Sequence, residues 1–504
     1  MLRLAEVLKG NGYLVTAAAA TNELNITGIT CDSRRVEPGY LFAAIPGTQT
    51  DGRRFISNAI ERGAVAVLAP AGTLPDEAHP EVSLITDDDP RRLYALMAAR
   101  FFERQPASVA AITGTSGKTS TAHFLRQIWI ASGLPAGSMG TLGIVATDAN
   151  GADLMPADGK ALTTPDAADL HRQLRELAET GVEHLAMEAS SHGLDQRRLD
   201  GVRISAAAFT NLSHDHLDYH GTESAYLNAK IRLFSELLID GGTAVINGDQ
   251  AYADTVIAAC RGRGLPIICY GSSGDRVRLI SAAARPDGQQ LQVNVDGVHH
   301  DFLLPLVGEF QASNALCALA LALATGSDPD VALNALAHLK GAPGRMERIG
   351  TGPKGGAVYV DYAHKPDALE RALQAFRPHT TGRLSVVFGC GGDRDAEKRP
   401  IMGRIAETLA DTVIVTDDNP RGEDAAAIRR AVMAASPSAR EIGDRGQAIS
   451  TAIAELQDGD VLVVAGKGHE TGQIVGDETL PFNDAQVISQ VISQMNRQLP
   501  GGEA

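Results

Sequence analysis

The sequence predicts an α/β protein with three domains: a small α/β N-terminal domain, a central parallel-sheet domain and a C-terminal α/β domain. Three observations lead to this prediction. The 504 residues are too many for one hydrophobic core. Two long regions alternate short apolar runs with helical patterns, which is typical of βαβ units and of a mainly parallel sheet. Breaks in this pattern give three parts, namely residues 1–105, 106–340 and 341–504.

Composition limits the class of protein. Hydrophobic residues make up 44% of the chain and charged residues 21%, as in an ordinary soluble protein. No apolar run approaches the roughly 18 residues of a membrane helix, and the N-terminus does not resemble a signal peptide. The five cysteines lack paired or metal-type spacing, which favours a reducing cytoplasm. The net charge of −16 argues against broad nucleic-acid binding, so anionic substrates must be met by local cations, backbone N–H groups or metal ions.

The first region combines short strands with one helix. Strands are expected at residues 26–30 and 40–45, where β-branched and apolar residues are bounded by turn residues. A helix is expected over residues 90–104. Asp89 is placed to cap it, and a proline occupies its first position, where the missing N–H costs nothing.

The central region begins a regular alternation of strands and helices. Its expected strands lie at residues 109–112, 184–188, 206–210 and 243–247. Residues 277–302 differ, because apolar and polar side chains alternate there after a Pro-Asp-Gly turn signal. We therefore expect an antiparallel hairpin within an otherwise parallel domain.

The third region repeats the strand–helix alternation. Its expected strands lie at residues 358–361, 384–389, 412–416 and 460–465. This pattern predicts a separate open sheet that is Rossmann-like in layout. Its first strand is not followed by Gly-x-Gly-x-x-Gly, so dinucleotide binding is not supported.

A glycine-rich segment follows the first strand of the central region. It consists of Gly114, Thr115, Ser116, Gly117, Lys118, Thr119 and Ser120. Backbone N–H groups of such a loop surround phosphate oxygens, Lys118 can reach the terminal phosphates, and the Thr119 hydroxyl can bind Mg²⁺. The central domain is therefore expected to be P-loop ATPase-like. The common loop has an earlier glycine at the position of Ile112, so the broad GTPase and motor ATPase classes are disfavoured.

Possible metal ligands follow two later strands of the central region. Glu188 ends an apolar strand, where an acid can bind Mg²⁺ beside a phosphate loop. Residues 214–220 hold three histidines and two aspartates, including His216. Zinc is one candidate, but nothing fixes a tetrahedral set, so a magnesium–phosphate site is favoured. Lys230, on a helical pattern, is typical of a solvated surface lysine.

Three loops of the third region follow expected strands. Residues 389–395 include Arg394, residues 417–421 include Arg421, and residues 466–470 include Glu470. Because parallel strands end at one edge of a sheet, these loops are expected to face one crevice. Two arginines suit a substrate with two carboxylates, and the glutamate suits an ammonium group.

Together, these segments resemble the Mur ligase family over nearly the whole chain. The segments that carry the resemblance are Thr113–Ser120, Thr163–Pro165, Glu188–Gly193, Asn211–Gly221, Asn314, Gly344–Glu347, Asp361–His364, Asp418–Arg421 and Gly466–Glu470. The resemblance implies an ADP-forming ligase that activates a carboxylate as an acyl phosphate. ATP would be bound by Gly114 to Ser120 together with Asn314, Arg345 and Asp361. Mg²⁺ would be bound by Thr119, Glu188, His216 and a CO₂-derived carbamate on Lys230, which replaces the solvated interpretation of that lysine.

The resemblance also assigns the other substrates. UDP-MurNAc-L-Ala-D-Glu would be bound by Ser33, Thr48, Gln49, Thr50, Thr163, Thr164, Ser190, Gln196 and Arg198. Leu162 stands where relatives often have asparagine. The Asp-Asn-Pro-Arg tetrad resembles the meso-diaminopimelate branch of the family. The amino acid would be bound by Arg394, Asp418, Asn419, Pro420, Arg421, Gly466 and Glu470. Lys118, His216 and Lys230 would serve catalysis.

Alternatives remain at this point. A lysine-adding sibling differs mainly at Arg421, because lysine has no second carboxylate for that arginine to bind. A folylpolyglutamate synthetase shares the loop and the ligase chemistry but lacks a UDP-sugar domain. A nucleotide-binding regulatory protein is disfavoured by the presence of Lys118, Glu188, His216 and Lys230. The expected protein is a cytoplasmic monomer with no nucleic-acid partner.

Overall fold

The computed structural model describes residues 2–9, 14–16, 24–47, 50–74, 79–155 and 162–498. Its chain divides into two units, which we describe separately. The first unit contains residues 1–118, 128–269 and 320–328, and the second contains residues 119–127, 270–319 and 329–504. Helices α4 (Lys118–Ala131) and α10 (Glu309–Ala324) and strand β14 (Ile267–Gly271) therefore contribute to both units.

The N-terminal part of the first unit is a five-stranded sheet in the order β2-β7-β6-β5-β4. Its strands are β2 (Leu14–Thr16), β7 (Ser83–Asp87), β6 (Ala66–Pro70), β5 (Tyr40–Ala43) and β4 (Gly28–Thr30). Strands β4 to β7 are parallel and β2 is antiparallel. The single strand expected at residues 26–30 is wrong, because Asn25–Ile26 forms β3 and pairs with β1 (Leu2–Arg3) instead.

Short helices complete this region: α1 (Leu4–Val7), α2 (Ile56–Glu61) and the 3₁₀ turns Ser33–Arg35 and Gly52–Phe55. The expected longer helix is α3 (Pro90–Phe102), and the Asp89 side chain accepts the Arg92 N–H at its start, at 3.1 Å. Leu93 and Met97 of α3 are buried with Leu68 of β6 in one apolar cluster. The burial of its apolar side chains holds α3 on this sheet.

The central strands of the first unit run in the order β10-β9-β11-β8-β12-β13. They are β10 (Gly143–Thr147), β9 (Ala136–Gly140), β11 (His184–Glu188), β8 (Ser108–Thr113), β12 (Ile204–Phe209) and β13 (Leu238–Asn247). All pairs are parallel except β9 with β10. The accompanying helices are α5 (Ala167–Glu179), α6 (Ser191–Asp195), α7 (Leu217–His220), α8 (Glu223–Arg232), the π turn Leu233–Leu237 and α9 (Ala253–Gly262).

The second unit contains the expected antiparallel excursion. Strands β15 (Val277–Arg285), β16 (Gly288–Val295) and β17 (Val298–Leu304) form consecutive antiparallel pairs. The predicted turn at Pro286 and Asp287 connects the first two of them. This stretch leads into α10 and α11 (Pro329–Leu336).

The C-terminal sheet of the second unit has the order β18-β19-β23-β20-β21-β22. Its strands are β18 (Glu347–Thr351), β19 (Ala357–Asp361), β23 (Val461–Ala465), β20 (Leu384–Phe388), β21 (Thr412–Val415) and β22 (Arg440–Glu441). Only β18 is antiparallel to its neighbour. The carboxyl ends of β19, β23, β20 and β21 therefore lie at one edge, as the sequence predicted for three of their loops.

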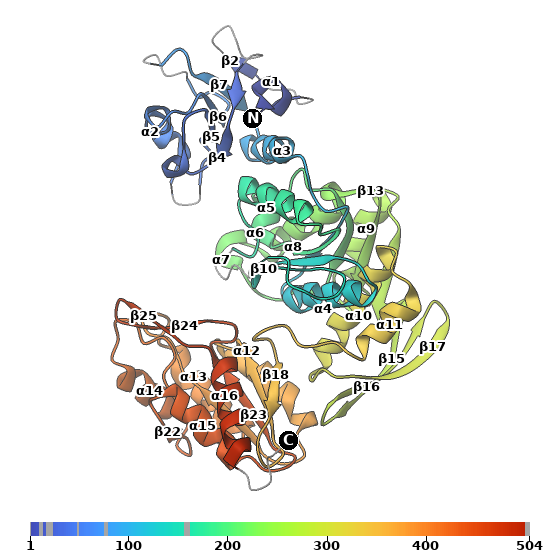
Figure 1. The fold of residues 1–504 in the computed structure, drawn as a ribbon, viewed down its shortest axis with the longest axis vertical. Helices are drawn as coiled ribbons and strands as arrows, with labels where there is room; N and C mark the ends of the chain where they lie inside the picture. The colour runs from blue at the N-terminus through green and yellow to red at the C-terminus, as the bar shows by residue number, and fades with distance from the viewer. Residues whose placement is uncertain are drawn as a thin grey trace. The chain divides into compact units, whose positions relative to one another are not determined.

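Helices and a hairpin surround this sheet (Figure 1). They are α12 (Pro366–Phe376), the 3₁₀ turn Arg377–His379, α13 (Lys398–Leu409), α14 (Ala425–Met433), α15 (Arg445–Glu455), α16 (Asp484–Gln498) and the hairpin strands β24 (Gly472–Val475) and β25 (Glu478–Pro481). Separate apolar clusters contain alternate residues of the strands, such as Val386 and Val387 of β20. A sheet buried on both faces explains the continuous apolar runs in its sequence. Within the described parts of the chain, no helix is long and apolar enough to cross a membrane.

Candidate functional site

The phosphate-loop segment lies between the end of β8 and the start of α4, as predicted. Gly117 precedes the helix with φ of 87°, in the left-handed region that favours glycine. Gly114 has φ of 150°, and a Cβ there would lie 1.9 Å from the Thr210 Oγ1 atom. Both glycines are therefore required by the backbone. The loop places N–H groups at a helix N-terminus, which is an anion-binding arrangement.

Residues after β12 brace this loop from one side. The Asn211 side chain accepts the Ser116 N–H at 2.9 Å, and the Thr210 hydroxyl donates to the Ser116 carbonyl at 2.7 Å. Lys118 Nζ donates to the carbonyls of Gly114 and Thr115 at 2.8 and 3.0 Å. The Lys118 ammonium thus lies within the loop that the sequence assigned to phosphate.

Lys230 is buried beside the same loop, so the interpretation of a solvated lysine is wrong. Its side chain is 1% exposed, and its Nζ donates to the Gly114 carbonyl at 2.9 Å. The ammonium also lies 4.3 Å from the centre of the Tyr226 ring. Burial, together with repulsion from Lys118, lowers the pKa of Lys230 well below its ordinary value. Helical periodicity missed this, because the face of α8 that meets the loop is fixed only by tertiary packing.

Glu188 is also buried, at 3% exposure, rather than solvated at a strand end. Its two carboxylate oxygens accept the Thr141 N–H at 2.8 Å and the Thr141 hydroxyl at 3.2 Å. In the sheet register Glu188 pairs with Ile112, one strand away from the phosphate loop. Glu188 thus stands at the end of the strand next to β8, which leads into the loop, while its carboxylate bonds Thr141 after β9.

His216 follows β12, on the other side of β8. It has φ of 54°, and its side chain is about half exposed. Its ring centre lies 4.9 Å from that of His192 and 6.1 Å from that of Tyr226. Tyr226 also contacts Lys230, so two of the four residues assigned to the metal, His216 and Lys230, approach one shared tyrosine.

The side chains around the loop fit a Mg²⁺ ion in their chemistry. Glu188 offers carboxylate oxygens, Thr119 offers a hydroxyl at the start of α4, and His216 offers an imidazole. Mg²⁺ takes few protein ligands and keeps waters and phosphate oxygens, so this small set suffices. Among the described residues, no group of three or more His, Cys, Asp or Glu side chains is arranged to hold a metal ion.

The residues assigned to the muramoyl dipeptide form one hydrogen-bonded network. The Thr164 hydroxyl donates to the Glu188 carbonyl at 3.1 Å and accepts the Ser190 N–H at 3.1 Å. Arg198 donates to the Thr164 carbonyl at 2.6 Å and to Gln196 Oε1 at 2.6 Å. The Thr163 hydroxyl lies 3.2 Å from that of Thr141, which contacts Glu188. Side chains from two segments, residues 163–164 and 190–198, thus meet beside Glu188.

The N-terminal residues of this set are only partly described. Ser33 is 8% exposed and begins a 3₁₀ turn. Arg35 of that turn forms a two-bonded ion pair with Asp169 of α5, at 2.8 and 2.9 Å. Helix α5 begins shortly after Thr164, so the turn is tied to the dipeptide network. Thr50 is described, whereas Thr48 and Gln49 lie outside the described residues. Leu162 is described and is 64% exposed.

The residues assigned to the nucleotide in the second unit also converge. Asn314 donates to Gln311 at 3.0 Å, and Gln311 donates to the Arg345 carbonyl at 3.5 Å. Asp361 ends β19 and accepts the Met346 N–H at 2.9 Å. The Arg345 guanidinium lies 4.7 Å from the centre of the Tyr362 ring. Burial raises the pKa of Asp361 above its usual range.

The three strand-end loops of the C-terminal sheet meet, as the sequence predicted. Arg421 donates to the carbonyls of Gly392 and Asn419 at 2.9 and 3.4 Å. Asn419 Nδ2 donates to Glu470 Oε2 at 3.0 Å. Asp418 approaches Gly466, whose added Cβ would lie 2.8 Å from an Asp418 oxygen. Pro420 belongs to the loop of Asn419 and Arg421, and Arg394, in the loop after β20, is exposed.

Two buried cations at this edge escaped prediction. Lys467 is 0% exposed and contacts Asn419 and Glu470. Arg445, also fully buried, pairs with Asp484 at 2.7 Å and donates to the Ala465 carbonyl at 3.0 Å. Lys467 stands between two glycines in a loop that the sequence had singled out, which was an available signal. Arg445 and Asp484 are distant in sequence, and neither carries a local sequence signal that predicts their pairing.

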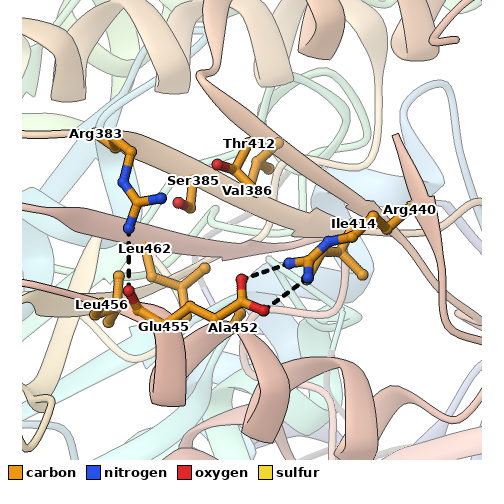
Figure 2. Close-up of a pocket in the computed structure, with 10 residues that line it drawn as sticks. All are labelled: Arg383, Ser385, Val386, Thr412, Ile414, Arg440, Ala452, Glu455, Leu456 and Leu462. Atoms are coloured by element: carbon orange, nitrogen blue, oxygen red, sulfur yellow. Dashed lines mark hydrogen bonds and ion pairs between the residues drawn. The ribbon is translucent and has the colours of Figure 1, made fainter. Parts of the chain in front are cut away.

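A small pocket lies at the opposite, amino edge of the same sheet. Figure 2 shows its lining residues, among which Glu455 bridges two arginines. Arg440 donates to both Glu455 oxygens at 2.7 and 2.6 Å, and Arg383 donates to the Glu455 carbonyl at 3.0 Å. Its cations are thus already paired, and open α/β sheets place ligands at the carboxyl edge. This pocket is not the candidate site.

Comparisons with known proteins identify three matching regions. The Mur ligase family catalytic domain matches residues 25–102, the Mur ligase middle domain matches residues 112–322, and the Mur ligase glutamate ligase domain matches residues 344–468. These three regions fall within the three parts expected from the sequence.

Two bacterial relatives match nearly the full chain. The UDP-N-acetylmuramoyl-L-alanyl-D-glutamate–2,6-diaminopimelate ligase of Caulobacter vibrioides is 53% identical over 470 residues, covering 93% of this chain and 95% of its own. The ligase of the same name from Bradyrhizobium diazoefficiens is 51% identical over 496 residues, covering 98% and 99%. A solved structure of a ligase of that name is 32% identical, has a TM-score of 0.73 and covers 98% of this chain and 99% of its own.

Proposed function

This chain belongs to the Mur ligase family, and we propose that it joins meso-2,6-diaminopimelate to UDP-MurNAc-L-Ala-D-Glu in peptidoglycan precursor synthesis. It is an ATP-dependent, ADP-forming amide ligase. Relatives that are 53% and 51% identical are named for this activity. The observation that carries the amino-acid assignment is the meeting of Arg421, Asn419 and Glu470 at one sheet edge. A guanidinium and a carboxylate there match the carboxylate and ammonium groups of the substrate.

The reaction has two chemical steps. The γ-carboxylate of D-glutamate attacks the γ-phosphate of ATP, which gives an acyl phosphate and ADP. The amine of diaminopimelate then attacks the acyl carbon, and phosphate leaves. The Lys118 ammonium offsets the negative charge of the transferring phosphoryl group. Thr119, Glu188 and His216 would hold Mg²⁺, which would supply positive charge to offset that of the phosphates.

Lys230 carries a carbamate in this proposal. Its neutral amine attacks the carbon of CO₂, an N–C bond forms, and one proton leaves to solvent. Burial favours this reaction, because it lowers the pKa of Lys230 and so increases the fraction of nucleophilic amine. The product replaces a cation near Lys118 with an anion and adds oxygen donors for Mg²⁺. Electron density for a carboxyl group on Lys230 Nζ in a crystal would test it, and density for a bare amine would contradict it.

The binding of the substrates would be divided among the three expected domains. Residues 1–105 would bind the UDP-sugar through Ser33 and residues 48–50. Residues 106–340 would bind ATP and the muramoyl dipeptide, and residues 341–504 would bind diaminopimelate. Further nucleotide contacts would come from Asn314, Arg345 and Asp361. The enzyme would act as a cytoplasmic monomer, which light scattering of the purified protein can check.

Two alternatives are less well supported. A lysine-adding ligase would leave Arg421 without a carboxylate partner, at a cost to binding. A folylpolyglutamate synthetase has no use for a UDP-sugar domain, whereas residues 25–102 match the catalytic domain of the Mur ligase family. Both alternatives predict a different amino-acid or acceptor requirement, so one assay can separate them.

The test is ADP release by the full chain with ATP, Mg²⁺ and UDP-MurNAc-L-Ala-D-Glu, comparing diaminopimelate with L-lysine. Release that requires diaminopimelate is expected, and the product mass should rise by one diaminopimelate residue. Lys118→Ala should abolish ADP formation, because the main cation at the phosphate loop is lost. Equal release with lysine, or turnover retained in Lys118→Ala, would refute the proposal.

A further inference from the structure

Lys467 is a buried cation in the loop after β23. Its side chain is 0% exposed, and it lies among residues assigned to an amino-acid substrate that itself carries positive charge. Burying an ammonium is costly unless anions and hydrogen-bond acceptors surround it. Its position therefore requires an explanation beyond packing.

The contacts of Lys467 join the strand-end loops of β21 and β23. Its Nζ donates to Asn419 Oδ1 at 2.9 Å and to Glu470 Oε2 at 3.1 Å. Asp418 Oδ1 lies 3.8 Å from the same nitrogen. Two carboxylates and one amide oxygen thus surround a single ammonium, and a net negative charge remains.

Asn419 is fixed by these contacts. Its Oδ1 accepts from Lys467 and also from the Ile474 N–H at 3.0 Å. Its Nδ2 donates to Glu470 Oε2 at 3.0 Å. The side-chain oxygen of Asn419 therefore has both acceptor positions used, and the amide orientation is determined by its partners.

The two carboxylate oxygens of Glu470 have different surroundings. Oε2 accepts from both Asn419 and Lys467. Oε1 receives no hydrogen bond from any group in the described part of the chain. The Glu470 side chain is 33% exposed, so a substrate can reach it. Oε1 is the oxygen that remains able to accept from a substrate ammonium.

We propose that Lys467 is a positioning residue that holds Asn419 and Glu470 so that Glu470 Oε1 receives an ammonium group of the amino-acid substrate. This inference rests on the proposed function. Lys467 does not touch the substrate; it fixes one Glu470 oxygen and leaves the other for recognition. It also limits repulsion between Asp418 and Glu470, which leaves one net negative charge for one ammonium.

The first test is steady-state kinetics of Lys467→Met in the full chain. The Met side chain has similar length but neither charge nor N–H donors. KM for diaminopimelate should rise at least about tenfold, because Glu470 loses its orientation, while KM for ATP changes less than about twofold. The matched control is Lys354→Met, the same change at an exposed lysine between β18 and β19, which should leave all constants unchanged.

A double-mutant cycle distinguishes positioning from general structural damage. If Lys467 acts through Glu470, then Lys467→Met should add little to the KM increase of Glu470→Gln. Additive effects on KM would overturn the proposal, as would an unchanged KM in Lys467→Met. Wild-type turnover with diaminopimelate is the reference, so its failure would refute the proposed function instead.

A crystal structure of the full chain with diaminopimelate needs no variant and decides the same point if Lys467→Met does not fold. A substrate ammonium on Glu470 Oε1, with Lys467 Nζ still on Oε2, is the expected result. A direct contact between Lys467 and the substrate, or substrate bound through Oε2, would overturn the inference.

Discussion

The two edges of the C-terminal sheet both carry cation–carboxylate pairs of similar length, but in different surroundings. At the amino edge, Arg440 and Glu455 pair at 2.6 Å with side chains 42% and 45% exposed. At the carboxyl edge, Arg445 and Asp484 pair at 2.7 Å with both side chains fully buried. Similar geometry therefore has different consequences, because water screens the first pair and is excluded from the second.

The comparison shows that the two edges differ in how deeply their charged pairs are buried. Exposed pairs contribute little to stability, so the amino edge tolerates them without a functional reason. Buried charges depend strongly on their partners, and the carboxyl edge concentrates them beneath the loops of Asp418 and Glu470. We infer that the buried cations give these loops one fixed arrangement, which recognition of a substrate by charge and shape requires. Four predictions test this comparison.

The largest effect is expected from breaking the buried pair. Asp484→Asn leaves the Arg445 guanidinium buried without its counter-charge, which should lower the free energy of unfolding by about 3–5 kcal/mol. Urea denaturation of the purified protein measures this. The control is Asp424→Asn, which keeps the cap of α14 and disturbs only an exposed pair with Arg430. A loss as small as that of the control would show that burial does not separate the two edges.

The next effect concerns the substrate at the carboxyl edge. Arg421→Ala should lower kcat/KM for diaminopimelate about 100-fold, which corresponds to about 3 kcal/mol, because a substrate carboxylate loses its partner. KM for ATP should stay nearly constant. Arg430→Ala, an exposed arginine of α14, serves as the control in the same ADP-release assay. An unchanged preference for diaminopimelate over lysine would remove Arg421 from the site.

A smaller effect is expected at the amino edge. Arg440→Ala should reduce the free energy of unfolding by about 0.2–1 kcal/mol, because the pair with Glu455 is exposed. Ligase activity should be unchanged, since the pocket in Figure 2 lies away from the strand-end loops. A double-mutant cycle with Glu455→Ala isolates the pair energy. A coupling as large as at the buried pair, or a loss of activity, would contradict the comparison.

The smallest effect is a pH dependence of opposite sign at the two edges. The hydrogen bond from Arg440 lowers the pKa of Glu455. The folded protein then binds fewer protons there than the unfolded chain, so the stabilisation is present above the unfolded pKa and is lost as pH falls through the folded one. The stability difference between wild type and Glu455→Gln, a few tenths of a kcal/mol, should therefore shrink below about pH 4.

The second site of the pH experiment is Asp418, at the carboxyl edge. Burial raises its pKa, so ionisation of Asp418 opposes folding at neutral pH and this opposition is relieved as pH falls. Thermal unfolding of wild type and both variants, Glu455→Gln and Asp418→Asn, between about pH 2 and pH 8 measures the two signs. A wild-type-minus-variant difference that changes with pH in the same direction at both sites would contradict the assignment.

Much of the site could be predicted because its residues follow strands. The glycines and Lys118 of the phosphate loop, Glu188 at the end of β11, and the loops of Asp418 and Glu470 all stand at carboxyl ends of apolar runs. Parallel strands bring such ends together whatever the details of packing. The antiparallel excursion of β15 to β17 was equally predictable from alternation and its turn signal.

Other residues could not be placed from their neighbours in sequence. The sequence around Lys230 is that of an ordinary helix, yet in the folded protein its Nζ donates to the Gly114 carbonyl. The residues expected to form one strand at 26–30 divide between two sheets. Both depend on contacts with distant segments, which local periodicity does not contain.

The sequence by itself determined the order of strands and helices, the phosphate loop and the chemical identity of the strand-end loops, because hydrophobic periodicity and turn chemistry are local. Only the tertiary structure decided which polar groups are buried and against which partners. It placed Lys230 beside the phosphate loop, paired Arg445 with Asp484 and set Lys467 against Asn419 and Glu470. The physical reason is that the free energy of a charge depends on its exclusion from water and on its neighbours, and folding alone sets both.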